Sequence, residues 1–155
     1  MSDHAGLRDD IRSREESQAV MTTKPTKTFE ENGVYKIYGN YSKKIAEMPS
    51  YAYLAVTRAE EEKQLSLSMQ FSLPTIITQA QKIFVPQHHN TAVDYLLQAI
   101  EDGLTRLLLP SIEREIRSNK KRRADEAAIK VFGDNLKHLL LTPPVRGLTV
   151  LGFDP

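Results

Sequence analysis

Residues 90–117 read NTAVDYLLQAIEDGLTRLLLPSIEREIR, and this stretch decides the fold. Its large apolar residues recur at intervals of three and four, which is the spacing of one face of an α-helix. They are Val93, Leu96, Leu97, Ile100, Leu104, Leu107 and Leu108. Asn90 and Thr91 are both residue types that cap a helix N-terminus. The pattern predicts a long helix with a buried stripe, and with it a mainly α fold.

Pro110 lies inside this apolar pattern. A proline in a helix removes one backbone donor and crowds the carbonyl four residues back, so we expect a bend near residues 106–111. A second apolar stripe follows and stops at Pro143, which cannot continue a helix. Its members are Ala124, Ala128, Val131, Phe132, Leu136, Leu139 and Leu140. Two adjacent long amphipathic helices predict a helical hairpin or a right-angled pair.

Shorter elements precede the long helix. Residues 64–71 alternate strictly between apolar and polar side chains, which predicts a strand that needs a partner. A helix is expected from Pro74 to just before Pro86, because the residue preceding a proline disfavours the helical region. Pro49 can open another helix as its first residue. A small strand element near residues 64–71 therefore accompanies the helices.

Most of the aromatic residues lie between residues 29 and 53. Such rings can stack on nucleic-acid bases. They can equally fill a small core where aliphatic residues are scarce, and this packing role is the one we expect.

The two ends of the chain differ in composition. Residues 1–31 are polar, with few apolar side chains, and predict a short helix over about residues 2–16 followed by a flexible connection. Residues 148–153 are a compact apolar run after a glycine and predict a buried strand. A buried strand needs neighbours, so we expect that the chain has been cut there. We therefore divide the chain into three parts: a short helix and flexible connection over residues 1–31, a helical region over residues 32–147, and the terminal strand over residues 148–155.

Composition excludes several classes of function. The 21 Lys and Arg residues nearly balance the 20 Asp and Glu, so nucleic-acid binding would require a local patch. There is no cysteine, and no N-terminal signal or membrane-spanning run, which leads us to expect a cytoplasmic protein without a disulfide framework. No Gly-rich phosphate loop or nucleophile elbow is present. We expect no enzymatic activity, no catalytic residues and no cofactor.

Two clusters could bind a ligand. His88 and His89 are adjacent without a nearby carboxylate or cysteine as third ligand, so a polar loop is expected and a metal site is not. A basic run consists of Lys120, Lys121, Arg122 and Arg123. It lies within residues 112–138, which contain eight Lys or Arg against five Asp or Glu. It could contact phosphates, with the salt dependence such contacts bring. The alternative is a solvated helix junction.

Three stretches resemble the bacterial Tex (transcription accessory protein) family. Residues 102–117 are similar to a family pattern of "DG, RLL, PS, ER, IR", residues 124–141 are followed by a proline segment as in the family, and residues 149–155 resemble the first strand of its YqgF-type, RNase H-like domain. Over residues 35–71 the match is weaker. Tyr51 and Ala52 replace the family's His-Arg, and Ala59 replaces a glycine.

The resemblance implies a connector between an N-terminal helical domain and an incomplete RNase H-like domain, in a protein that binds RNA. Nucleic acid would then be bound through the parent protein, with transcription or translation machinery as a further class of partner and no membrane partner. Asp154 would be the first-strand acid of that RNase H-like domain, a vestige without the further carboxylates of a two-metal site. A nuclease remnant that uses Asp154 is one alternative. Another is a protein-binding module that docks a partner through residues 64–71 or 91–117.

Overall fold

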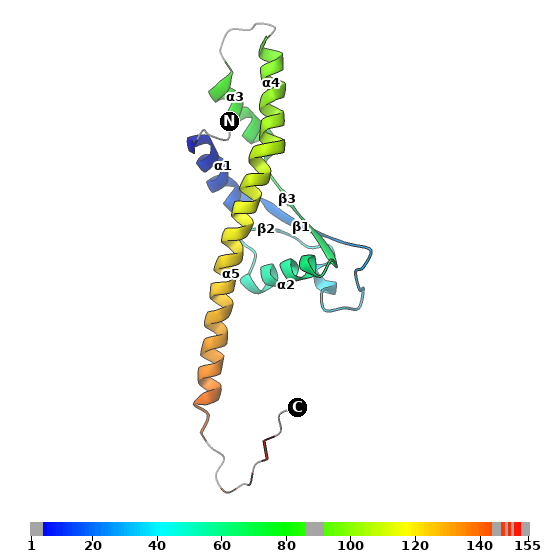
Figure 1. The fold of residues 1–155 in the computed structure, drawn as a ribbon, viewed down its shortest axis with the longest axis vertical. Coiled ribbons are helices and arrows are strands. Elements are labelled where there is room, and N and C mark those ends of the chain that lie inside the picture. The colour runs from blue at the N-terminus through cyan, green and yellow to red at the C-terminus, as the bar shows by residue number, and fades with distance from the viewer. Residues whose placement is uncertain (1–4, 86–91, 144–146, 148, 150, 153–155) are drawn as a thin grey trace.

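The computed structural model describes residues 5–85 and 92–143 and the single residues 147, 149, 151 and 152. The fold is mainly helical, with one small antiparallel sheet beside a very long helix (Figure 1). The elements in chain order are α1 (Ala5–Gln18), β1 (Val20–Pro25), the 3-10 turn η1 (Lys36–Tyr38), β2 (Ser42–Lys44), α2 (Ser50–Glu61), β3 (Leu65–Gln70), α3 (Leu73–Phe84), α4 (Ala92–Asp102), the π-helical segment η2 (Gly103–Leu108) and α5 (Leu109–Leu140). The expected mainly α fold is confirmed.

The long helix passes Pro110 without the expected bend. α4, η2 and α5 follow one another as a single rod, roughly 70 Å long at the rise of an α-helix (Figure 1). Before the proline, the backbone N–H of Leu109 donates to the carbonyl of Leu104, five residues back. This wider turn accommodates the proline ring without breaking the rod. The prediction of a bend was wrong, because a π-helical turn took its place.

The predicted hairpin or right-angled pair is also wrong. Residues 118–123, which separate the two apolar stripes, contain neither glycine nor proline. Nothing in them ends a helix, so the two stripes lie on one continuous helix.

The sheet has the strand order β2-β1-β3, with β1 antiparallel to both neighbours. The strand predicted at residues 64–71 is confirmed: in β3, Leu65, Leu67 and Met69 are buried while the intervening residues are exposed. Its partner β1 lies in the segment expected to be a flexible connection, so that expectation was wrong. Threonine concealed the strand, because Thr23 occupies a buried position next to Met21 where an apolar residue would have revealed the alternation.

Buried Thr23 also ties the sheet to the aromatic segment. Its hydroxyl donates to the carbonyl of Tyr38 and accepts from the backbone N–H of Tyr41, 2.9 Å away. Tyr38 and Tyr35 are buried, and the rings of Tyr38 and Tyr41 meet edge to face at 5.5 Å between centroids. The aromatic residues therefore contribute to the core, as expected.

Three helices attach to the rod (Figure 1). α1 confirms the helix expected near the N-terminus, and its two large apolar residues, Leu7 and Ile11, are fully buried although they are sparse. α2 follows Pro49, crosses α5, and inserts Tyr53, whose hydroxyl donates to the carbonyl of Arg117 at 2.8 Å. The helix predicted after Pro74 is confirmed as α3, which lies beside α4.

Several predictions concern the C-terminal end. Residues 147, 149, 151 and 152 belong to no strand, so the terminal strand is not confirmed at the positions that the structure describes. Phe153 and Asp154 lie outside the described residues, as do the loop at His88 and His89 and the cap at Asn90 or Thr91.

The second apolar stripe, near the end of α5, is mostly exposed. Ala124 is buried at the edge of the body, but the large apolar side chains beyond it are not. The reason is position: α5 extends past α2 and the sheet, so no element of the described chain covers this part (Figure 1).

Candidate functional site

The basic run on α5 does not form one cationic surface. Each residue of an α-helix is rotated by about 100° from the preceding one, so four consecutive side chains point in four directions. Three of the four are paired with carboxylates: Lys121 with Glu61 at 3.1 Å, Arg122 with Glu126 at 3.8 Å, and Arg123 with Glu16 at 2.9 Å. These pairs largely neutralise the run.

Lys120 has no ion-pair partner within 4.0 Å among the described residues. It lines a small pocket of about 180 Å³ between α5 and the start of α2, together with Arg123, Glu16 and Ser50. Burial lowers the pKa of Lys120, and the neighbouring positive charge of Arg123 lowers it further. A phosphate here would meet Glu16 as well as the two cations, which weakens any attraction. Phosphate contact by the run stays a prediction, and within the described residues the carboxylates of Glu16, Glu61 and Glu126 would oppose it.

Two ion-pair clusters hold the body to the rod instead. Glu115 on α5 accepts hydrogen bonds from Arg12 at 2.6 Å and from Arg8 at 3.0 Å, both on α1. The hydrogen bond from Arg12 and then that from Arg8 keep the pKa of the Glu115 carboxyl below its ordinary value, although partial burial opposes this.

The second cluster joins α2 to α5 through Arg117 and Glu60. Burial opposes the charge on Arg117, but its hydrogen bond to Glu60 outweighs burial and the pKa of the guanidinium is raised. Glu113 lies 3.8 Å from the same guanidinium, one helical turn away. Both clusters are partly buried, where charge pairs are screened less by salt. They fix α1 and α2 on the rod at neighbouring turns.

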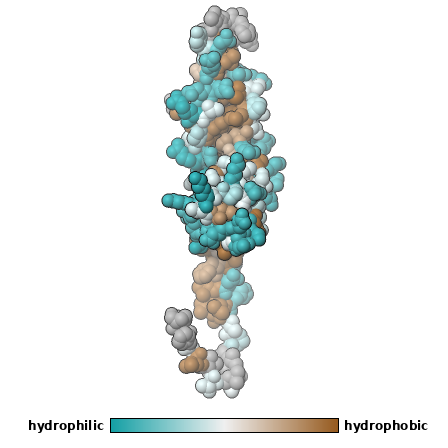
Figure 2. Space-filling model, turned by 90° about the vertical axis from the view of Figure 1, so that its right-hand side faces the viewer, coloured by the Kyte–Doolittle hydropathy of each residue, from teal (hydrophilic) through white to brown (hydrophobic). Residues whose placement is uncertain are grey.

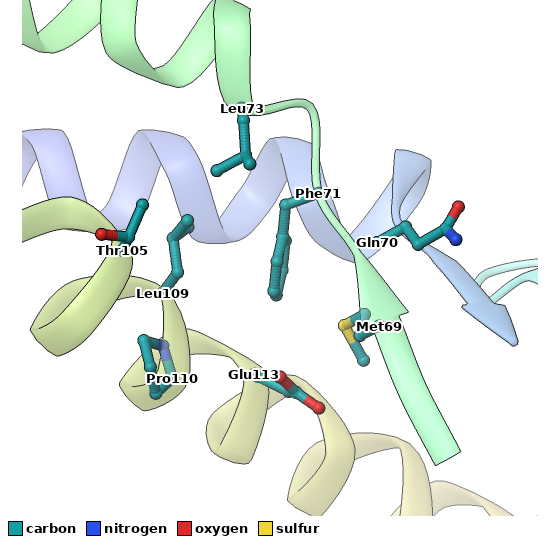
Figure 3. Close-up of a pocket in the computed structure, with 8 residues that line it drawn as sticks. All are labelled: Met69, Gln70, Phe71, Leu73, Thr105, Leu109, Pro110 and Glu113. Atoms are coloured by element: carbon teal, nitrogen blue, oxygen red, sulfur yellow. The ribbon is translucent and has the colours of Figure 1, made fainter. Parts of the chain in front are cut away.

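An open pocket of about 560 Å³ lies between the end of β3 and the junction of η2 with α5 (Figure 3). The ring of Phe71 extends into it toward Leu109, while the side chain of Gln70 points away. Its other lining residues are Met69, Leu73, Thr105, Pro110 and Glu113. Glu113 is the single ionisable residue in the lining, and with Gln70 and Thr105 as the other polar residues it does not form a nucleophile-base pair or a paired-acid site. We assign no chemistry to it.

The described residues contain no group of three or more His, Cys, Asp or Glu side chains that could hold a metal ion. None of the helices in this part of the chain is long and apolar enough to cross a membrane. The absence of activity remains a prediction, and Asp154, His88 and His89 lie outside the described ranges.

A groove of about 620 Å³ lies where α2 meets the exposed part of α5. It is lined by Ser50, Tyr51, Leu54, Ala127, Ala128, Val131, Phe132 and Asn135. Figure 2 shows apolar surface on the segment of α5 that extends beyond the body. The sequence indicated these residues as a stripe but gave no sign that they would be exposed, because periodicity identifies a face and not what covers it.

The architecture defines a class of protein: a small body of helices and one antiparallel sheet, carried on a helix much longer than the body requires. The chain belongs to the Tex central region-like family, which it matches over residues 1–132. This confirms the resemblance, whereas the likeness of residues 149–155 to an RNase H-like domain lies outside the matched range.

Individual relatives agree with this assignment. The chain is 38% identical over 126 residues to the Uncharacterized protein YdcI of Bacillus subtilis, a match that covers 81% of this chain and 18% of that protein. It is 34% identical over 117 residues to the Transcriptional accessory protein Tex of Neisseria gonorrhoeae, covering 70% of this chain and 15% of that one. S1 RNA-binding domain-containing protein 1 of Homo sapiens is 40% identical over 60 residues, 39% of this chain and 6% of that protein. The chain thus spans less than a fifth of the length of these relatives.

Proposed function

We propose that this chain is a non-catalytic connector within an RNA-binding transcription accessory protein of the Tex type. The observation that carries the proposal is the continuous helix over α4, η2 and α5, which is much longer than the body attached to it. A helix of this length transmits position between its ends without a joint. That is the mechanical property a connector between binding domains needs.

Attachment of the body supports the same role. α1 is fixed to the rod through Glu115, and α2 through Tyr53 and the Arg117 ion pair. These contacts involve adjacent turns of α5 and combine apolar burial with charge-assisted hydrogen bonds, which are stronger than neutral ones. The body can therefore stiffen the middle of the rod. It can also fix the direction of α1 relative to the rod.

The part of the proposal that concerns RNA rests on the names of two relatives. One is named for an S1 RNA-binding domain and another as a transcriptional accessory protein. Within this chain the basic run is largely neutralised by Glu16, Glu61 and Glu126. We therefore assign RNA contact to other parts of the parent protein, and orientation of those parts to this chain.

Rigidity of the rod is the first test. Because the chain lacks cysteine, spin labels can be placed at Gln98→Cys and Lys130→Cys, two exposed positions on either side of η2. For a continuous helix the labels lie roughly 48 Å apart with a narrow distance distribution. A matched variant with three glycines inserted after Asn119 should give a broad distribution. A distribution in the parent chain as broad as in this variant would refute the connector role.

RNA binding by the chain itself is the second test. Fluorescence anisotropy with a labelled single-stranded RNA should give weak binding, with a Kd above roughly 10⁻⁴ M at physiological salt. Replacing Lys120, Lys121, Arg122 and Arg123 together by alanine should leave the affinity and its salt dependence nearly unchanged. A large loss of affinity with a shallower salt slope would instead make the basic run a direct RNA contact.

A further inference from the structure

The outer edge of β3 carries unpaired backbone groups. β3 is an edge strand, because the strand order is β2-β1-β3. The backbone N–H of Thr26 donates to the carbonyl of Gln64 across the β1-β3 pair, so every second residue of β3 counted from Gln64 bonds to β1. The residues between them, which include Leu67 and Met69, direct their N–H and C=O groups to the outer edge. None of the described residues bonds to these groups.

This edge has the properties of a site for strand addition. β3 contains no charged residue and no proline, the residue types that commonly keep edge strands from pairing. An unpaired edge of this kind is a template for an extended peptide, whose main chain supplies the hydrogen bonds. Specificity then depends on where the side chains of the peptide lie.

Some of these side chains would enter the open pocket beside the edge. Met69 lines this pocket of about 560 Å³, and Figure 3 shows the pocket between the end of β3 and the junction of η2 with α5. A residue that an added strand places opposite Met69 has its side chain on the same face of the sheet as Met69. The ring of Phe71 and the side chain of Leu109 would contact the apolar part of that side chain.

A free backbone acceptor of the rod lies at the wall of this pocket. The carbonyl of Thr105 would accept from Leu109 in an α-helix and from Pro110 in a π-helix. Leu109 donates to Leu104 instead, and Pro110 has no N–H. The carbonyl of Thr105 is therefore left without a helical donor. It points along the helix toward Leu109, and since both residues line the pocket, this carbonyl can accept from a ligand there.

Glu113 gives the pocket a negative charge. It is the single ionisable residue in the lining. Arg117 lies 3.8 Å from its carboxylate, beyond hydrogen-bond distance, and donates to Glu60 instead. Glu113 and the carbonyl of Thr105 are both acceptors, so the complementary ligand is a cation with an apolar stem.

This charge also distinguishes between occupants. A second copy of the chain could pair its own β3 with the edge, but the core-facing side chains of β3 are Leu65, Leu67 and Met69, which bring no positive charge to Glu113. An arginine or lysine of a partner would bring an apolar stem to Phe71 and a charged donor to Glu113. A basic, otherwise apolar segment therefore fits the edge better than a second β3.

We propose that the outer edge of β3 binds an extended peptide segment of a partner protein, and that an arginine or lysine of this segment enters the pocket and pairs with Glu113. The segment becomes the fourth strand of the sheet through hydrogen bonds to the backbone of Leu67 and Met69. This interaction goes beyond the connector role and is independent of it, because a rigid rod needs no added strand.

The first measurement uses synthetic peptides of seven residues. Threonine occupies the odd positions, and arginine lies between two valines, two leucines or two phenylalanines at the even positions. Fluorescence anisotropy with the 155-residue chain should show saturable binding, and glutamate in place of the arginine should weaken it by at least tenfold. If no arginine peptide binds more tightly than its glutamate version, the proposal is wrong.

Substitution of Glu113 tests the pocket. Glu113→Gln should weaken the arginine peptide by about fivefold or more, and Glu113→Lys should reverse the preference in favour of the glutamate peptide. Glu101→Gln, at an exposed glutamate outside the pocket, is the matched control and should change neither affinity. Far-UV circular dichroism checks that the variants keep their helix content. An unchanged preference in Glu113→Lys would remove the pocket from the interaction.

N-methylation of the peptide separates strand addition from simple charge attraction. The N–H groups of successive residues in a strand point to opposite edges, so only one alternate set of peptide N–H groups can face β3. Methylating that set should abolish binding, and methylating the other set should leave the affinity nearly unchanged. Equal effects of the two sets would overturn strand addition, even if the charge preference were observed.

Amide hydrogen exchange tests the edge directly. In the free chain the amides of Leu67 and Met69 should exchange faster than those of Ser66 and Ser68, which bond to β1, and the arginine peptide should slow them. Equal protection of all four amides in a monomeric free chain would mean that the edge is closed. The same protection in a chain that sediments as a dimer would assign the edge to a second copy. Either result overturns the proposal.

Discussion

Tyr53 should be the side chain on which the attachment of α2 to the rod most depends. It is 1% exposed, and its hydroxyl donates to the carbonyl of Arg117 in the middle of α5. Removing the ring in Tyr53→Ala leaves a cavity and should lower the free energy of unfolding by about 3–5 kcal/mol. Tyr53→Phe keeps the ring and loses one hydrogen bond, which costs about 0.5–1.5 kcal/mol.

The matched control lies on the same helix. Tyr51 is 73% exposed, so Tyr51→Ala should change stability by less than about 0.5 kcal/mol. Urea unfolding followed by the helical signal at low micromolar protein measures all three variants. In thermal melts each kcal/mol corresponds to about 2–4 °C for a chain of this size. If Tyr51→Ala cost as much as Tyr53→Ala, the described docking of α2 would be wrong.

Three further substitutions test other parts of the structure. Glu115→Gln should destabilise the chain at neutral pH, and the deficit should shrink as the pH falls below the ordinary carboxyl pKa of 4.5, because a carboxyl whose pKa is lowered by folding loses its contribution on protonation; a deficit independent of pH in urea unfolding would contradict this. Thr23→Val should cost about 1–3 kcal/mol in the same assay, since two hydrogen bonds of a buried hydroxyl are lost. Gly133→Ala should stabilise α5 by about 0.5–1 kcal/mol and increase the helical signal, because nothing lies within 4 Å of the added methyl group.

The elements that sequence predicted correctly are those whose periodicity is carried by apolar residues. β3 alternates leucine and methionine with serine and glutamine, and α3 has Pro74 in its first turn and a clear apolar helical face. β1 was missed because its buried positions are shared between Met21 and Thr23, whose hydroxyl is satisfied only by backbone groups 15 and 18 residues away. Contacts of that kind are not visible in a local pattern.

The candidate sites show the same limit. The basic run is evident in the sequence, yet its neutralisation depends on Glu16 and Glu61, residues about 60 or more positions away. The apolar stripe of α5 was also evident, but whether it is buried depends on how far the body extends along the rod. Sequence identified the residues, and only the tertiary arrangement determined which of them are free to bind.

The π-helical segment η2 has a consequence for insertions and deletions. A π-helical turn holds one more residue than an α-helical turn, so η2 offsets the faces of α4 and α5 by one position. Deleting one residue there would allow an uninterrupted α-helix and would leave α4 and the attached α3 pointing in nearly the same direction, because the wider turn of η2 already absorbs the extra residue. Deleting one residue from α4 or α5 instead would rotate the two ends of the rod against each other by about 100°. A change of one residue is therefore tolerated in η2 without redirecting either end of the molecule.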